Sequence, residues 1–368
     1  MGSSSAPMAE QHDDDEEEMP DLEPFFFDEA EAVADHERRL RREQEAARKE
    51  ERRVWAVNVN KAVMESILDY DPKQEGEYCT RFPFADFSRF DLDEESPLGP
   101  MRYTDDRVLS KGDRYLRHAG VNILSVKIAS LDVCFPVQVY GTVIVRDNID
   151  RKCIYLFRRE KDHCQLINST DESLILTGPK RGLLLLDDAY IEIDLKIKDH
   201  QGQEEKELSK GFLTIRGTTG RHMGKCVVES KGLATRFSTM QVMYAVVDNA
   251  VEATIAIEVL RGEFYGKITA CTTSIPNHLV LLHDSKVDGV MNGNGKGVIQ
   301  LLLSVVSVCQ DENLLVNIVA QTGDVECQET IAFTPRIRGR AGEEITVGAT
   351  KLLVKVAWSL INNSRVVL

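Results

Sequence analysis

Two turns bounded by glycine present basic side chains that could bind a phosphate or a carboxylate. The run GPKRG at residues 178–182 carries Lys180 and Arg181, and the run GNGKG at residues 293–297 carries Lys296. Glycine-rich backbone beside a lysine can cradle phosphate oxygens. Neither run has the spacing of a P-loop, and neither precedes a helical pattern whose N-terminus could add to the site. We therefore interpret both runs as hairpin turns and take Lys180, Arg181 and Lys296 as the candidate binding residues.

The turn at residues 178–182 is expected to be rigid. Pro179 restricts φ to about −65°, and a glycine on either side accepts positive φ. Lys180 and Arg181 would then be displayed together at the tip of the turn. On an acidic protein, such a tip is either an ordinary exposed turn or a contact for an acidic or phosphorylated partner.

The residues that commonly carry catalysis do not form a recognised pattern. His163 and Cys164 are adjacent, but neighbouring residues of a strand point to opposite faces and cannot pair as base and nucleophile. His278 and His283 lack the spacing of metal ligands. No Gly-x-Ser-x-Gly elbow of a hydrolase is present. We expect neither a metal nor a cofactor.

Two classes of function remain open at this point. The first is a non-catalytic binding or interaction module for an unknown protein partner or an acidic or phosphorylated ligand. The alternative is an enzyme of unrecognised type, a hydrolase or a phosphate-binding enzyme, built on the Gly-Lys turns or on residues 162–164. The two classes differ in geometry, because an enzyme needs the candidate side chains to converge in one concave pocket.

The elements that would position these residues are predicted to be strands. Residues 137–145 and 153–157 read as a hairpin, and residues 190–199 alternate between apolar and charged side chains. A period of two is typical of a half-buried antiparallel strand. Serial short strands continue to the C-terminal end, separated by Gly, Asn and Asp turns. We predict an all-β body at residues 121–368, an antiparallel β-sandwich that is either one large unit or two packed similar halves, 121–235 and 236–368.

A weak internal repeat would support the division into halves. Residues 137–145 align with residues 251–259, and the turn at 178–182 then falls one residue from the turn at 293–297. A repeat of this length would mean two similar sandwiches rather than a solenoid. The opposing interpretation is that any two hairpins of an all-β chain align this well.

The residues before the β-rich body are predicted to form an appendage. Residues 1–30 are acidic and of low complexity, which predicts a disordered tail. Residues 31–57 form a charged, solvated helix whose apolar stripe has one position per heptad, fewer than a coiled coil needs. Its four arginines between residues 38 and 42 form a solvated face or a patch for an acidic partner or nuclear import. Residues 58–120 read as an extended approach segment whose aromatic rings lie over a sheet.

Composition restricts the partners and the compartment. The net charge of −15 argues against binding along duplex nucleic acid, which favours a basic surface. No apolar run approaches the roughly 20 residues that span a bilayer, and no secretory signal is visible. The chain is therefore expected in the cytoplasm, with the nucleus as the alternative, and not in a membrane. The eight cysteines include no Cys-x-x-Cys pair, and we expect free, packed thiols.

Several long motifs resemble a known family. They are MESILDYDP, DEESPLGPMR, YGTVIVRD, LILTGPKRGL, YIEIDLKIKD and VEATIAIEVL, spread from Met64 towards the C-terminal end. They resemble the grass proteins grouped as domain of unknown function 6598. The resemblance implies a plant protein but transfers no activity, because the family has no established one.

The resemblance also implies a biological context. Related domains occur in cereal proteins, including jasmonate-induced ones, beside a ribosome-inactivating N-glycosidase domain. The run EAAR at residues 45–48 is similar to a motif of those N-glycosidases, but it lies in a charged helix with no apolar face to bury it. We therefore expect a stress or defence association without N-glycosidase activity.

The charged appendage is predicted to contribute little to stability, because it has little apolar surface to bury. Removing residues 1–54 should lower the melting temperature of the chain by less than about 10 °C, where roughly 4–8 °C corresponds to 1 kcal/mol in a small domain. Differential scanning calorimetry of the full and shortened chains measures this difference. A larger drop contradicts the prediction.

Overall fold

The computed structural model describes residues 28–72, 75–101, 117–198, 205–217, 225–288, 291–293, 297–323 and 325–361. The chain forms two compact units, Met1–Val57 and Asn58–Leu368. The expected acidic tail at residues 1–30 lies outside the described residues except for its last three positions.

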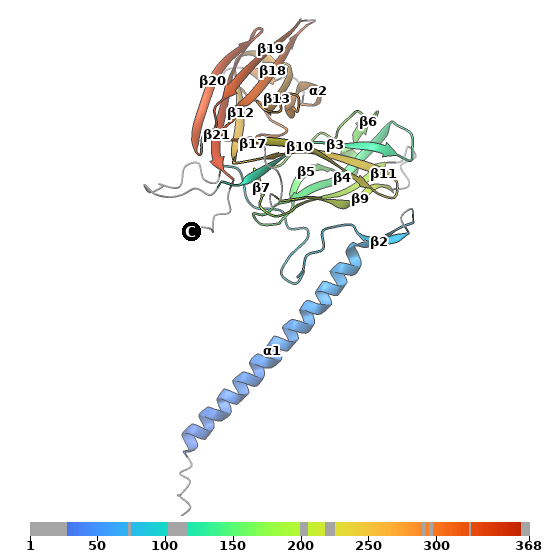
Figure 1. Cartoon of the computed structure of the whole chain (residues 1–368), viewed down its shortest axis with the longest axis vertical. Coiled ribbons are helices and arrows are strands. Elements are labelled where there is room, and N and C mark those ends of the chain that lie inside the picture. The colour runs from blue at the N-terminus through green and yellow to red at the C-terminus, as the bar shows by residue number, and fades with distance from the viewer. Residues whose placement is uncertain are drawn as a thin grey trace, which may run out of the picture. The chain divides into compact units, whose positions relative to one another are not determined.

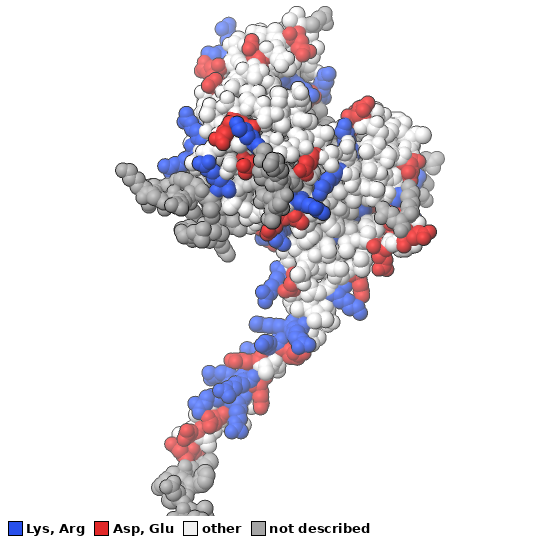
Figure 2. Space-filling model, in the orientation of Figure 1, with Lys and Arg blue, Asp and Glu red and all other residues white. Residues whose placement is uncertain are grey.

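Helix α1 (Glu29–Ile67) begins at a capping residue and presents charges along its length. The Asp28 carboxylate accepts a hydrogen bond from the backbone N–H of Ala30 at 2.9 Å, which satisfies one of the free donors at the helix start. Its stripe residues Val33, Leu40 and Val54 are exposed, which agrees with a solvated helix. Figure 2 shows basic and acidic side chains interspersed along it. Within the described residues, no helix has the length and apolar character needed to cross a bilayer.

The helix is longer than the sequence predicts. It continues ten residues beyond the expected end at residue 57, because neither proline nor glycine interrupts the chain before Pro72. The expected extended segment at 58–120 therefore begins as helix. The short hairpin of β1 (Leu68–Asp71) and β2 (Gly76–Cys79) follows.

Among the remaining described residues, the regular structure is antiparallel strand apart from two short helical pieces, which confirms the all-β prediction (Figure 1). These pieces are the 3-10 turn η1 (Lys161–His163) and α2 (Ser285–Asp288). The strands that build the first half are β3 (Ala119–Leu131), β4 (Val137–Arg146), β5 (Ile154–Arg159), β6 (Gln165–Ile167), β7 (Leu183–Leu185), β8 (Ala189–Lys198), β9 (Glu205–Ile215), β10 (Cys226–Ala234) and β11 (Ser238–Val247).

The second half is built from the strands that follow. They are β12 (Ala250–Phe264), β13 (Gly266–Thr272), β14 (Val280–Asp284), β15 (Met291–Gly293), β16 (Gly297–Val298), β17 (Val305–Cys309), β18 (Leu314–Thr322), β19 (Val325–Phe333), β20 (Gly339–Val347) and β21 (Thr350–Leu360).

Each half is a two-sheet sandwich with its own core. In the first half, the sheet β10-β11-β3-β7 packs on the sheet β5-β4-β8-β9 through inward residues such as Val126, Val143 and Ile193. In the second half, β20-β21-β12 with β17 packs on β14-β13-β18-β19 through residues such as Ile257, Ile268 and Ile318. Figure 1 shows the two layers of the second half around β12 and β13.

The two halves have the same strand order. Each strand of the first half has a counterpart at the same place in the sheets of the second half. The counterparts are β3 and β12, β4 and β13, β5 and β14, β7 and β17, β8 and β18, β9 and β19, β10 and β20, and β11 and β21. All these pairings are antiparallel in both halves. The chain is therefore a tandem of two sandwiches of one topology.

Local irregularities coincide as well and fix which residues are equivalent. The β4–β5 ladder has a bulge after Val143, and the β13–β14 ladder has a bulge after Ile268. Counting back from these positions makes Gly141 and Gly266 equivalent. A Cβ atom on Gly141 would lie 2.2 Å from the carbonyl oxygen of Asp194, and one on Gly266 would lie 1.9 Å from that of Val319. Both halves thus need a glycine where β4 or β13 approaches its neighbour closely.

The repeat predicted from the sequence exists, but its alignment is wrong. Residues 137–145 form β4, whose counterpart is β13, whereas residues 251–259 form β12. Apolar alternation is common to all these strands and cannot distinguish them. The expected boundary at 235/236 is also displaced, because β11 pairs with β3 and contributes Met240, Val242 and Tyr244 to the first core. The halves meet at Asp248 and Asn249, between β11 and β12.

The halves contact each other through reciprocal polar bonds. Asn122 of β3 accepts a hydrogen bond from the Ser307 N–H at 2.8 Å and donates one to the Ser307 carbonyl at 2.7 Å. Glu252 of β12 accepts a hydrogen bond from the Gly182 N–H at 2.6 Å. The two contacts occupy matching positions. Asn122 follows Val121, which pairs with Leu183 of β7, and Glu252 follows Val251, which pairs with Val308 of β17. Their partners Gly182 and Ser307 directly precede Leu183 and Val308. The interface therefore has the reciprocal form of a two-fold contact.

A small apolar cluster completes this interface. It contains Leu184 and Val247 from the first half and Ala250, Cys309 and Ile361 from the second. Gly120 fits against it without a side chain, since a Cβ atom there would lie 3.0 Å from Ala250 Cβ. The halves are thus joined by packed and hydrogen-bonded surface as well as by the chain.

The equivalent glycines allow a matched test of the tandem. Gly141→Ala and Gly266→Ala should each lower the free energy of unfolding by roughly 1–3 kcal/mol or more, because the new methyl group meets backbone oxygen. Gly342→Ala on β20 is the control, since its Cβ would have contacts of 3.7 Å or longer. Guanidinium unfolding measures all three. Equal losses for Gly266→Ala and Gly342→Ala contradict the need for glycine at the close approach, and a loss for Gly141→Ala alone contradicts the structural equivalence.

Candidate functional site

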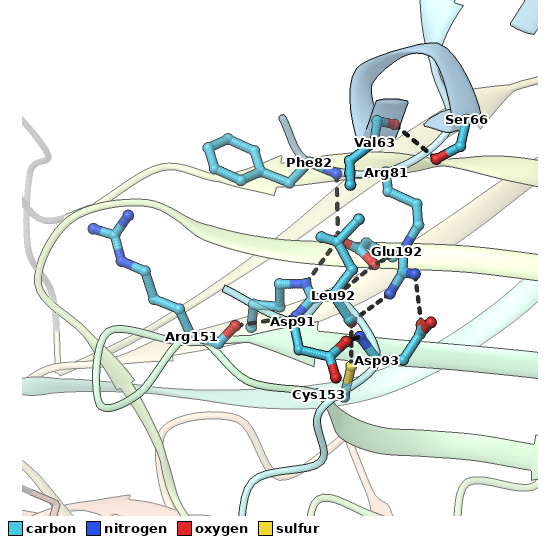
Figure 3. A network of polar contacts seen from close by, with 11 residues as sticks. Val63, Ser66, Arg81, Phe82, Asp91, Leu92, Asp93, Arg151, Cys153 and Glu192 are labelled. Atoms are coloured by element: carbon cyan, nitrogen blue, oxygen red, sulfur yellow. Dashed lines mark hydrogen bonds and ion pairs between the residues drawn. The ribbon is translucent and has the colours of Figure 1, made fainter. Parts of the chain in front are cut away.

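A network of charged residues lies on the outer face of the first half, with Arg146 and Glu192 buried at its centre. Arg146 at the end of β4 is fully buried and donates to both carboxylate oxygens of Glu192 on β8, at 2.7 and 3.1 Å. Arg81 donates to the same carboxylate at 2.9 Å and to Asp93 at 2.6 Å. Figure 3 shows Arg81 and the backbone of Phe82 beside Glu192, with Leu92 and Asp93 close to them.

Aromatic rings complete the layer over this face. Residues 80–93, which we call the covering segment, place Phe82 on Tyr190 with ring centroids 3.5 Å apart. Phe84 and Phe90 each lie with their ring centroids 5.6 Å from the Arg146 guanidinium. The aromatic spacing thus predicted correctly that rings in this segment lie over a sheet. It gave no sign that Glu192, on the charged side of the alternating strand, would be buried.

The network has a structural role: it holds the covering segment on the sheet, and its polar groups form hydrogen bonds with one another. The Leu92 carbonyl accepts from both Arg81 and Arg146, and the Phe82 N–H donates to Glu192 at 3.2 Å. Burial acts to lower the pKa of Arg81, but the adjacent Glu192 carboxylate outweighs it and raises that pKa. A permanently charged arginine holds the segment but is a poor proton donor. A cavity of about 120 Å³ remains between the segment and the sheet.

The structure corrects the expected basic tip at residues 178–182. Arg181 is buried and binds Asp147 through two nitrogens, at 2.6 and 2.9 Å, and Asp150 at 3.2 Å. Lys180 is exposed and pairs with Glu95 at 2.6 Å. The two side chains therefore point apart, because the buried carboxylate of Asp147 draws Arg181 inward. Lys296 lies outside the described residues.

The glycine that opens this turn is needed for a reason other than the expected one. Gly178 does not have the positive φ that the sequence suggests. A Cβ atom there would lie 1.9 Å from the carbonyl oxygen of Tyr155. The turn is thus packed tightly against β5, and it is not an open display of its side chains.

The other candidate catalytic residues are dispersed. His163 is exposed on η1, and the Cys164 thiol donates to the Lys161 carbonyl at 3.1 Å. Neither of them, nor Lys180 or Arg181, lines the cavities described in this section. The convergence that the enzyme alternative requires is absent among these four described residues.

The sequence does not reveal a contact between a serine and a histidine that the structure contains. His283 Nε2 lies 3.0 Å from Ser285 Oγ, and His283 Nδ1 lies 3.2 Å from the Gln300 carbonyl oxygen. Both side chains are buried, and Ser285 Oγ accepts the Gly266 N–H at 3.1 Å. A nucleophile must reach its substrate, so this contact is best explained as a structural bond that ties the end of β14 to β13.

Metal and thiol chemistry find little support in the described part of the chain. No group of three or more His, Cys, Asp or Glu side chains there is arranged to hold a metal ion. All eight cysteines are described as free thiols, but only Cys153, Cys271 and Cys309 are buried and Cys134 is exposed, so the expected packing holds for a minority of them. Burial raises the pKa of Cys226 to about 11, with the Glu312 carboxylate adding to the effect. Such a thiol is a weak nucleophile near neutral pH.

Within the described part of the chain, the outer face of the second half is hollowed where that of the first half is covered. A cavity of about 380 Å³ lies on the sheet β14-β13-β18-β19. We call it the open face, and it is lined by Lys267, Thr269, Cys271, Pro276, Leu279, Leu315, Asn317, Val319 and Gln328. Leu279 at its rim is 46% exposed, so the hollow offers apolar surface to a ligand. A second cavity of about 270 Å³ adjoins it at Lys267 and Val319.

The lining of the open face is equivalent to the residues beneath the covering segment. From the matched bulges and registers, Leu315 occupies the position of Tyr190, Asn317 that of Glu192, and Cys271 that of Arg146. Asn317 donates to Cys271 Sγ at 3.7 Å and accepts from the Thr330 hydroxyl at 2.8 Å. The ion pair of the first half is thus replaced by a neutral polar contact.

The residues that line the open face could not be identified from the sequence. Asn317 and Thr269 are ordinary polar residues on the outer face of strands, and their meaning depends on the correct pairing of halves. The charged network of the first half does have a signal in the sequence. Arg146 and Asp147 are two consecutive charges at the end of an apolar strand, which is unusual unless both are paired.

The two basic residues of the turn should behave differently when neutralised. Arg181→Met leaves Asp147 buried without its cation and should cost about 3–5 kcal/mol of unfolding free energy. Lys180→Met removes an exposed pair and should cost at most about 1 kcal/mol. Chemical denaturation of both variants decides the matter. A large loss for Lys180→Met or a small one for Arg181→Met contradicts the burial of Arg181.

Comparison with known proteins identifies a family. The sequence model of the family described as Domain of unknown function (DUF6598) matches residues 120–356. No curated protein matches the chain. Among solved structures, human GIVD cytosolic phospholipase A2 is similar over 67% of this chain and 31% of its own, with 6% identity and a TM-score of 0.25. The chain thus spans less than a third of that protein's length, and a TM-score this low does not indicate a shared fold. The family match runs from β3 into β21, and the chain therefore belongs to the DUF6598 family.

Proposed function

We propose that this protein is a non-catalytic binding module whose ligand occupies the open face of its second half. One observation carries the proposal. The two halves share a topology, yet the outer face that the covering segment fills in the first half is hollow in the second. A face that is filled in one copy and hollow in the other is suited to an external ligand.

The chemistry of the lining favours binding over catalysis. Lys267 is the only charged residue among the nine that line the open face. Cys271 at its floor has a pKa raised by burial, which disfavours a reactive thiolate. Leu279, Leu315 and Val319 supply apolar contact, and Thr269, Asn317 and Gln328 can fix orientation through hydrogen bonds. A mostly apolar hollow with a few polar groups is typical of ligand sites.

The open face is a better candidate than the turn at residues 178–182. An acidic or phosphorylated partner at that turn would meet only Lys180, already paired with Glu95, because Arg181 is buried. A single exposed lysine provides little binding energy.

We also propose the setting in which this module acts. The family resemblance supports a plant protein with a stress or defence association, and the acidic composition supports a partner other than duplex nucleic acid. The cytoplasm is the proposed compartment, and the arginine-rich part of α1 makes the nucleus the alternative.

Blocking the open face tests the proposal. The tagged full-length chain captures partners from native tissue extract, and mass spectrometry compares variants with the wild type. Asn317→Trp fills the hollow and Leu279→Arg places a charge at its rim, so both should lose the partner. Lys355→Ala, on the other sheet of the same half, is the matched control and should keep it. Melting temperatures confirm that each variant is folded.

The proposal is wrong if folded Asn317→Trp and Leu279→Arg chains capture the same partners as the wild type. A turnover of substrate that depends on residues 162–164 or on Lys180 would instead support the enzyme alternative.

A further inference from the structure

The covering segment shows what this kind of face binds. Its backbone N–H at Phe82 donates to Glu192 at 3.2 Å, its Phe82 ring lies on Tyr190, and its Arg81 pairs with Glu192. A non-helical peptide, with an aromatic ring next to a charged side chain, therefore fits the outer face of β8 and its neighbours.

The second half keeps the first two of these features and changes the third. Leu315 provides an apolar surface at the position of Tyr190, and Asn317 provides a polar side chain at the position of Glu192. The carboxylate that attracts an arginine is gone. On the neighbouring strand, Lys267 occupies the position of Thr142 and is the only charged residue that lines the open face, whereas the adjoining cavity is also lined by Lys286, Asp284 and Glu326.

We propose that the open face binds an extended peptide segment of a partner protein that carries an aromatic side chain beside a carboxylate. This inference rests on the proposed function and names its ligand. The aromatic ring packs on Leu315 and Leu279, the peptide backbone bonds to Asn317, and the carboxylate pairs with Lys267. Charge complementarity separates this ligand from the covering segment, whose arginine suits Glu192 and is repelled by Lys267.

The size of the hollow fits such a ligand. The cavity of about 380 Å³ and the adjoining one of about 270 Å³ share Lys267 and Val319, so the hollow extends along β13 and β18. An extended peptide advances about 3.3 Å per residue and places alternate side chains on one face. A few residues can therefore contact both cavities.

The experiment uses two fluorescent peptides and the full-length chain. The first peptide has the sequence of residues 80–90 with Asp86→Asn, so that Arg81 and Arg89 are its only charged side chains, and the second has in addition Arg81→Glu and Arg89→Glu. Fluorescence polarisation should show the acidic peptide binding about tenfold more tightly than the basic one, the ratio that roughly 1.4 kcal/mol produces.

A double variant should reverse this preference. Asn317→Glu with Lys267→Thr gives the open face the residues that the first half has at these two positions, Glu192 and Thr142, so the basic peptide should then bind about tenfold more tightly than the acidic one. Lys355→Ala is the control and should keep the wild-type preference. Both positions are outside the core, and a melting curve verifies that the double variant is folded.

The outcomes separate this inference from the proposed function. If neither peptide binds, or if the double variant does not change the preference, the inference is wrong. If Asn317→Trp and Leu279→Arg still remove a partner from the extract, the module function stands with a ligand of another class. A concentration-dependent dimer that the same two variants abolish would assign the open face to a second copy and would also overturn the inference.

Discussion

Two consecutive buried charges at the end of β4 hold the first half together. Arg146 and Asp147 point to opposite sides of the strand, as neighbouring strand residues do. Arg146 binds Glu192 and the Leu92 carbonyl, so it fixes the covering segment. Asp147 binds Arg181 and the Leu184 N–H, so it fixes the start of β7, where Glu252 of the second half is also bound. Because an unpaired buried charge is far more costly than a paired one, the removal of either partner of a pair would leave the other partner strongly destabilising.

The two halves share the features that the fold requires and differ in the residues of their outer faces. The strand order, the bulge after Val143 or Ile268 and the close approach at Gly141 or Gly266 recur in both. None of these features can vary freely, because each is set by backbone geometry. The outer faces do vary, and they differ in the residues that decide whether a charged segment is bound there.

The fold class could be predicted because alternation in strands such as residues 190–198 is a local property. The burial of Glu192 could not be predicted, since its partner Arg81 lies far away in sequence and no local rule distinguishes Glu192 from the exposed Asp194. Arg181 was misjudged for the same reason, because the position of Asp147 depends on the pairing of β4. The repeat was found in the wrong register because apolar alternation is alike in all strands. The open face could not be predicted from the sequence, because its identification requires the correct pairing of strands between the two halves.

The reciprocal contact between Asn122 and Ser307 and between Glu252 and Gly182 has a consequence for how the halves can diverge. In a dimer of identical subunits every substitution appears twice, so a face cannot close on one subunit and stay open on the other. Covalent linkage through Asp248 and Asn249 removes that restriction and keeps the pair at a high effective concentration. Each half can then lose one of the contacts its counterpart keeps. Asn122 and Glu252 already illustrate this freedom, since an amide and a carboxylate now do the same work at matched positions.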